Sequence, residues 1–254
     1  MTIALKDLRS YYHSFSFYFL FAMFAAISGF FFWLALNHFA LASFQAQTTQ
    51  DIALRAVNMT DGVISPFIGN LCALALLVIP ILSMRAFSEE RKAGTLELLV
   101  TYPVSDFQIV LGKFVALMTL FLFMILPTTF YFLMAAVIRA KFEVLSLVSG
   151  YAGLWLVAMS FASLCLFVSS LTSEQVVSTG IGFLLLLFFW IVGWIAEWVN
   201  PSIGFIFREL SLVEHLRDFS RGIIDTKDVA FYLIFVSFFL FATLSVLEVR
   251  SWKR

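Results

Sequence analysis

The stretch SEERKAGTLELLVTYPVSDFQIVLGK, residues 88–113, is a polar island between two long apolar runs. It gathers acidic and basic side chains, two glycines and a proline, in a chain that is 62% hydrophobic and only 13% charged. Soluble domains are roughly half apolar and about a quarter charged. The chain is therefore an integral membrane protein, and the island is a compact polar element between two of its membrane-spanning segments.

Charge-free windows define these spans. Crossing the hydrocarbon takes about 20 apolar residues in a helix, and in lipid only helices or closed barrels satisfy their backbone. The apolar runs are long and continuous, unlike the short alternating strands of a barrel, so an all-α protein is expected. We predict six transmembrane helices near residues 15–36, 64–84, 109–137, 147–170, 176–197 and 229–248, with a short turn at 139–143 joining the third and fourth.

Lysine and arginine placement sets the expected orientation. With both termini on the inner side, that side carries nine of the sixteen basic residues and the outer side seven. The bias is sharper at the helix ends, where Arg85, Lys113 and the C-terminal cluster 250–254 lie. The positive-inside rule then places both termini, and the island, in the cytoplasm.

Several kinds of site are disfavoured. Basic and acidic residues cancel, and no basic patch that would bind nucleic acid is visible. Cys72 and Cys165 lie inside apolar runs without metal-ligand spacing, which is typical of buried cysteines. His13, His38 and His215 are scattered and form no zinc motif. We therefore expect no catalytic, metal or cofactor site in this chain.

The first half of the island predicts a short amphipathic helix. Ser88 before Glu89 and Glu90 is typical of an N-cap followed by acids in the first turn. The helix should end before Pro103, because the residue preceding proline is driven out of helical geometry. Gly94 would weaken it by about 1 kcal/mol relative to alanine. Its apolar stripe comprises Ala93, Leu96, Leu99 and Val100.

The second half of the island predicts a new helix start. Ser105 with Gln108 three residues later is typical of a capping box. The helix then continues from Asp106 into the third span, with Lys113 close enough to the surface to snorkel. The residues alone leave two interpretations open: an ordinary amphipathic loop lying on lipid, or a rigid docking element for a soluble partner.

The island resembles the signature loop of ABC-2 type transporter permeases. In that family, E-x-x-x-GTLE-x-L is followed by a P-[VI]-S break and by GK at the start of the third span. The resemblance is closest to a small six-helix group that includes gliding-motility-associated and NosY-like permeases, and LVEHLRDFSRGIIDTKDVAFY, 212–232, also resembles the gliding-motility group. The matching island residues are Glu90, Gly94-Thr95-Leu96-Glu97, Leu99, Pro103-Val104-Ser105 and Gly112-Lys113.

The resemblance implies a type V exporter-like fold in a single transmembrane domain, 1–254, that works as a dimer with two cytoplasmic ATPase subunits. ATP and Mg²⁺ would be bound by that partner, because the Gly112-Lys113 pair has Phe107 and Phe114 where a phosphate-binding loop needs Gly and Ser or Thr. The loop 86–108 would contain the coupling helix, and the third span would carry its movement into the membrane. The implied ATPase-coupling residues are Ser88, Glu89, Glu90, Arg91, Lys92, Gly94, Thr95, Leu96, Glu97, Leu99 and Pro103.

Two further segments flank the spans. Residues 1–14 predict an amphipathic interfacial helix, which is either a plain membrane anchor or a contact for the ATPase. Residues 199–228 form a polar outer segment, with a helical stripe that begins at Ile206. They form either a half-buried re-entrant hairpin that closes the outer end of the pathway, as the resemblance implies, or an interfacial helix. Candidate outer gate residues are Glu197, Leu210, Val213, Leu216 and Phe219.

The expected function is that of a permease in a bacterial inner membrane, exporting a lipidic, amphipathic or polymeric substrate. Partners would be the ATPase, a second identical or similar permease, membrane lipid and accessory periplasmic or membrane proteins. Gly180 and Gly182 would permit close helix packing at a dimer seam. The alternative is a membrane scaffold, coupled to an ATPase, that supports motility or assembly of a surface machine without moving a substrate.

Overall fold

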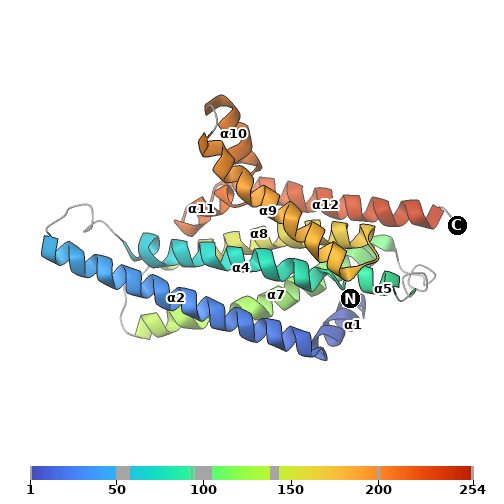
Figure 1. The fold of residues 1–254 in the computed structure, drawn as a ribbon, viewed down its shortest axis with the longest axis horizontal. Helices are drawn as coiled ribbons and strands as arrows, with labels where there is room; N and C mark the ends of the chain where they lie inside the picture. The colour runs from blue at the N-terminus through green and yellow to red at the C-terminus, as the bar shows by residue number, and fades with distance from the viewer. Residues whose placement is uncertain are drawn as a thin grey trace.

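The computed structural model describes residues 2–49, 58–92, 94, 105–137, 143–198 and 201–252. Within these ranges the chain is helical and contains no strand. The helices lie largely side by side, with α10 standing away from the bundle (Figure 1). The elements are α1 (Thr2–Tyr12), α2 (Phe15–Thr49), the π-helical turn η1 (Thr60–Ile64), α4 (Ser65–Ser83), α5 (Ser88–Lys92), α7 (Asp106–Val137), α8 (Val144–Leu171), α9 (Gln175–Trp198), α10 (Pro201–Leu210), α11 (Glu214–Ser220) and α12 (Thr226–Trp252).

Six of the described helical segments are long and apolar enough to cross a membrane, which confirms the predicted fold class. Each overlaps one predicted span. Their bounds are Phe15–Gln45, Thr60–Ser83, Asp106–Ala135, Val144–Leu171, Gln175–Ala196 and Thr226–Val249.

The first span extends well past its predicted end. The prediction stopped near residue 36, where the sequence turns more polar, but α2 continues as helix to Thr49. No proline or glycine interrupts residues 37–49, and the Asn37 amide is satisfied by the Trp33 carbonyl at 2.8 Å. Polarity marks the edge of the hydrocarbon, whereas a helix ends only where a breaker or a cap ends it.

The central helix of the bundle is α8. It packs against α4, α7, α9, α11 and α12, and 72% of its most apolar window is buried. Buried serines along it are satisfied by their own helix, as when Ser163 donates to the Ser160 carbonyl at 2.9 Å. By contrast, the spans α2, α9 and α12 lie at the periphery, with at most 22% of their windows buried. Their apolar faces are therefore available to lipid or to another protein.

An aromatic cluster joins α2, α4 and α7. The Phe32 ring stacks on Tyr131 with centroids 5.3 Å apart and meets Phe67 edge-on at 5.4 Å. Phe132 meets both phenylalanines edge-on, at 5.2 and 5.5 Å. Offset and edge-to-face pairs each add about 0.5–1.5 kcal/mol beyond the area that they bury. These rings fix the first span against the second and third.

One glycine, Gly182, lets α9 pack closely against α8 and α4. A Cβ at Gly182 would lie 3.3 Å from Cys165 Sγ of α8 and 4.0 Å from Pro80 of α4. The small size of Gly182 therefore serves packing within one chain, and the dimer seam stays a prediction. Gly180, in contrast, has open space beside it.

Candidate coupling site

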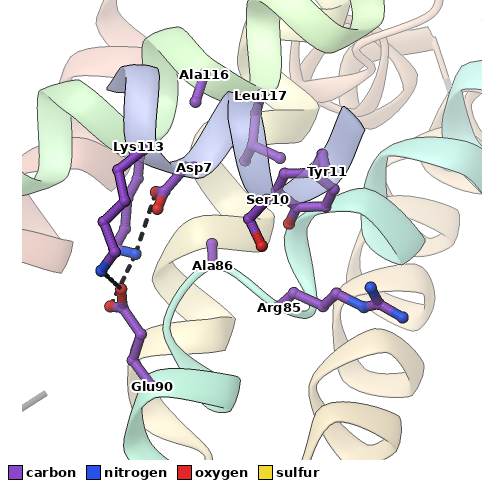
Figure 2. A pocket seen from close by; sticks show the side chains of 10 residues that line it. Asp7, Ser10, Tyr11, Arg85, Ala86, Glu90, Lys113, Ala116 and Leu117 are labelled. Atoms are coloured by element: carbon purple, nitrogen blue, oxygen red, sulfur yellow. Dashed lines mark hydrogen bonds and ion pairs between the residues drawn. The ribbon is translucent and has the colours of Figure 1, made fainter. Parts of the chain in front are cut away.

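A buried lysine lies at the junction of α1, α5 and α7. Lys113 Nζ is 2.8 Å from Glu90 Oε2 and 3.3 Å from Asp7 Oδ2, and its side chain is 2% exposed. The ammonium also lies 5.1 Å from the Phe87 ring centroid. Figure 2 shows the two carboxylates reaching the lysine from different elements. One cation thus links the N-terminal helix, the island helix α5 and the third span.

The charges of this cluster alternate in sign. Lys6 Nζ approaches Glu90 Oε1 at 3.5 Å from the solvent side, because its own side chain is 63% exposed. Burial raises the pKa of Asp7, the nearby charge of Glu90 adds to the increase, and Lys113 opposes it. The positive charge of Lys113 therefore favours the ionised form of Asp7.

A second set of contacts fastens the start of α5 to α8. The Ser169 hydroxyl accepts hydrogen bonds from the backbone N–H groups of Phe87 and Ser88, at 3.2 and 3.3 Å. The Ser88 hydroxyl donates in turn to the Ser169 carbonyl at 3.3 Å. Both serines are fully buried. Buried backbone donors need such partners, so this contact fixes where α5 begins.

The basic end of α5 meets the carboxyl end of α8. Arg91 Nη1 donates to the Ser170 carbonyl at 3.2 Å, and Lys92 pairs with Glu174 at 3.2 Å beyond the helix end. The last carbonyls of a helix have no partner within it and carry its negative pole, so basic side chains are favoured there. The island helix is thereby oriented at both of its ends.

A pocket of about 260 Å³ lies beside Lys113 (Figure 2). Tyr11 Oη closes one part of it by donating to the Leu82 carbonyl at 2.6 Å, and Arg85 donates to the Ser14 hydroxyl at 3.1 Å. These bonds hold α1 against the end of α4. The pocket is lined by Lys6, Asp7, Ser10, Tyr11, Arg85, Ala86, Glu90, Lys113, Ala116 and Leu117.

The segment between α9 and α12 forms two helices that meet at a corner. The second of them, α11, packs tightly on α8: a Cβ at Gly153 would lie only 2.5 Å from Phe219 Cβ and 3.0 Å from Leu216 Cδ1. The Ser149 hydroxyl donates to the Phe219 carbonyl at 2.8 Å. α11 packs against α8 and α4, whereas α10 stands away from the bundle (Figure 1). Closure of the outer end of the pathway by this α10–α11 hairpin stays a prediction.

The sequence model of the ABC-2 family transporter proteins matches residues 1–248, which is nearly the whole chain. The chain belongs to the ABC-2 transporter family. It is a multi-pass permease subunit of an ABC transporter, a transport component that is not itself catalytic. No curated protein matches the sequence.

Several predicted coupling residues of this ABC-2 permease point into the membrane domain. Ser88, Glu90 and Arg91 contact α8, α7 or α1, as described above, while Lys92 is exposed. The prediction that Ser88 caps a helix is wrong, because Ser88 is the first residue of α5 and its hydroxyl is bound to Ser169. Lys113 does not snorkel to the surface, because two carboxylates hold it inside.

The predicted amphipathic helix does not run unbroken through Gly94. Its first part, α5, ends at Lys92, and the Gly94 backbone has φ +69° and donates to the Arg91 carbonyl at 3.2 Å. A glycine in this left-handed conformation commonly terminates a helix. The second start is confirmed by the bond from Gln108 N–H to the Ser105 hydroxyl at 3.4 Å. The Glu89 side chain, Ala93, Thr95, Leu96, Glu97, Leu99, Val100 and Pro103 lie outside the described residues.

The candidate gate residues of the permease separate into two groups. Leu216 and Phe219 are buried against α8, whereas Leu210 is 42% exposed and Val213 is half-buried. The predicted helical stripe is interrupted, because α10 ends at Leu210 and α11 begins only at Glu214. The side chain of Glu197 lies outside the described residues.

Sequence reasoning missed the partners of Lys113 and the pairing of His215 with Asp228. A signal was available for the first: a lone lysine two turns inside an apolar helix needs a counter-charge, and Asp7 and Glu90 are acids in adjoining segments. The second pair was not detectable by spacing, because the two residues lie on different helices that meet only through the fold.

Proposed function

We propose that a separate cytoplasmic ABC ATPase drives this permease by docking on the island, residues 88–103, and moving α5. The observation that supports this most directly is the buried ion pair between Glu90 and Lys113. It ties the island helix to the third span at 2.8 Å, with a lysine side chain that is only 2% exposed. A loop that merely lay on lipid would need no such attachment.

The contacts of α5 determine which spans would move when the ATPase displaces it. Lys113 links α5 to α7, and Ser169 links it to α8. Charged contacts desolvated on both sides resist separation, so α5 would move together with the ends of these two spans. The partner would bind ATP and Mg²⁺ and hydrolyse the ATP, and this chain would transmit the resulting movement into the membrane.

The proposed substrate is lipidic, amphipathic or polymeric, and the permease would act as a homodimer or with a similar permease. The described spans carry their charges near their ends, as with Lys113 in α7 and Asp228 in α12. The peripheral spans present extended apolar faces, with Trp194 and Phe238 each 62% exposed. Apolar pathways and faces of this kind suit lipid-like cargo and a second subunit. We place the protein in a bacterial inner membrane with both termini cytoplasmic.

The second candidate is an ATPase-coupled scaffold for motility or surface assembly. It is favoured by the resemblance of residues 212–232 to gliding-motility-associated permeases. Both functions use the same docking on α5, and they differ in whether material crosses the membrane. Cells that carry an ATPase with its phosphate-loop lysine replaced separate the two functions. Substrate that accumulates inside these cells supports export, whereas an unchanged substrate distribution together with lost motility supports the scaffold.

Co-purification tests the docking itself. Glu97→Arg and Leu96→Asp alter the island, and we expect both to abolish co-purification with the ATPase while membrane insertion continues. Glu214→Arg, on the partly exposed helix α11 far along the chain, is the matched control and should leave co-purification unchanged. Normal recovery of the ATPase with both island variants would refute the docking site.

A further inference from the structure

A buried histidine–aspartate pair joins the hairpin to the last span. His215 Nδ1 lies 2.6 Å from Asp228 Oδ1, and the two side chains are 6% and 1% exposed. The other ring nitrogen, Nε2, is 3.1 Å from the Glu209 carbonyl. The imidazole stacks on the Phe231 ring, with centroids 4.3 Å apart. One ring therefore contacts α10, α11 and α12 at once.

The hydrogen-bond partners determine how many protons the pair holds. A carbonyl oxygen can only accept, so Nε2 must carry a hydrogen to bond to Glu209. Nδ1 and Oδ1 at 2.6 Å then require a second hydrogen between them. Without it, two lone pairs would face each other in a buried space. The closed arrangement thus retains one proton more than a neutral imidazole and a carboxylate, and its net charge is zero.

Among the described residues, no other hydrogen-bond donor takes the place of that proton beside the Asp228 carboxylate. Asp228 Oδ2 is buried and has no hydrogen-bond partner among the described residues. Tyr232 meets the imidazole edge-on at 6.0 Å, but its hydroxyl donates to the Leu212 carbonyl at 2.7 Å. The pair is therefore enclosed by apolar rings and by polar groups that are already bonded.

The charged groups on the adjoining elements are exposed, half-buried or paired with one another. The side chains of Arg208 and Glu209 on α10 are exposed, and Asp218 on α11 is half-buried. From α8 and α4, the uncharged groups Ser149 and Ser65 reach α11. The remaining ion pairs are Glu214 with Arg217 on α11, Asp61 with Arg221 between η1 and the end of α11, and Asp225 with Lys227 before α12.

We propose that the His215–Asp228 pair is a proton-retaining lock that holds the α10–α11 hairpin against α12. Opening separates the imidazole from the carboxylate and exposes both to water. The protonated closed pair then becomes a neutral imidazole, a carboxylate and one proton released to solvent. The lock belongs to the fold of the α10–α11 hairpin and does not depend on the proposed function.

The direction of the pH dependence follows from this balance. A solvated imidazole loses its proton near pH 6.5, whereas a solvated aspartate stays ionised above about pH 4. Above about pH 7 each opening event therefore releases close to one proton. By linkage, the open fraction should rise up to about tenfold for each pH unit. Acidification toward pH 6 should hold the hairpin closed.

Cysteine labelling of the purified permease tests the lock without any ATPase. Ser220→Cys is nearly isosteric and reports on a position that is 3% exposed where α11 meets α4. Ile223→Cys, 57% exposed, normalises for the reactivity of the thiolate. Cys72 and Cys165 are first replaced by alanine. We expect the normalised labelling rate at position 220 to rise several-fold to tenfold per pH unit between pH 7 and 8.5.

Asp228→Asn is the decisive comparison. An asparagine amide can donate to Nδ1 while Nε2 still donates to Glu209, so the lock stays closed without a labile proton. We expect the pH slope at position 220 to vanish in this variant, whereas Glu214→Gln, on the same helix, should retain the native slope. Equal slopes with and without Asp228→Asn would overturn the proposal. A flat profile in the otherwise native chain would overturn it even if the variant failed to fold.

Discussion

Removing the positive charge of Lys113 should uncouple the island from the third span. In Lys113→Met, the side chain keeps most of its length, but Asp7 and Glu90 lose the cation that lies 3.3 and 2.8 Å from them. Two carboxylates then face each other in a region where their side chains are only 15% and 14% exposed. We expect α5 to detach from α7.

The size of the effect follows from burial. Breaking a buried ion pair by removing one partner costs about 3–5 kcal/mol, because an uncompensated charge remains inside. Lys6 approaches Glu90 at 3.5 Å but is 63% exposed, so it recovers only a small part. For a chain of this size, each kcal/mol lowers the melting temperature by about 2–4 °C. The expected decrease is therefore about 6–20 °C.

Thermal unfolding of the purified permease, monitored by size-exclusion fluorescence, measures this decrease. Lys92→Met is the matched control: it also removes a lysine from an ion pair at 3.2 Å, but both partners are about 60% exposed. Such surface pairs contribute about 0–1 kcal/mol, so the control should melt within about 4 °C of the native chain. In complexes with the ATPase, Lys113→Met should also reduce transport more than it reduces ATPase binding.

The pH dependence of the stability tests the role assigned to Lys113. The raised pKa of Asp7 means that the folded state binds a proton there more tightly than the unfolded state. The favourable contribution is therefore complete below the ordinary value of 3.8 and is lost as pH rises through the folded pKa. In Lys113→Met this dependence should grow, so lowering the pH from 7 to 5 should recover part of the lost stability. A variant that melts like Lys92→Met, or that shows no recovery in acid, would contradict the assigned role of Lys113.

Three further expectations follow from the packing. Ser169→Ala should destabilise the protein by about 1–3 kcal/mol, because it leaves the buried N–H groups of Phe87 and Ser88 without their acceptor. As the control, Ser237→Ala, an exposed serine bonded within its own helix, should melt like the native chain. Gly153→Ala should cost about 1–3 kcal/mol by pressing on Phe219, whereas Gly180→Ala has open space and should be neutral or slightly stabilising. Ile223→Cys should react with an impermeant thiol reagent from outside intact cells and Lys92→Cys should not; the reverse pattern would invert the proposed orientation.

The fold was predictable from hydropathy because membrane spans are specified by their length and apolarity, which are local properties. The six spans appear where charge-free windows place them. The boundaries were less predictable, since a helix end depends on breakers and caps. Gly94 illustrates this: in the sequence it reads as a weak point within a helix, whereas its positive φ makes it part of a terminating turn.

The candidate site was only partly predictable, because its contacts join residues far apart in the sequence. Glu90 matches a family motif and looks like a surface residue of an amphipathic helix, yet it lies against a lysine from another helix. The same is true of Ser88: its sequence context is typical of an N-cap, but its hydroxyl is bonded to Ser169 of another helix. Local patterns identify which polar residues are available, whereas packing decides which way they face.

The central position of α8 changes the expected route of coupling. The sequence favoured α7 as the helix that carries movement, because α7 continues directly from the island. However, α8 is bonded to α5 at Ser169, near its carboxyl end, and to α11 at Ser149, 20 residues earlier. At 1.5 Å per residue, α8 spans about 30 Å between these contacts. A rigid shift of α8 would therefore reach the hairpin that holds the His215–Asp228 pair. By comparison, α7 contacts α12 less extensively than α8 does. A double-mutant cycle between Ser169→Ala and Asp228→Asn tests this route: sites so far apart should be additive to within about 0.5 kcal/mol unless α8 couples them.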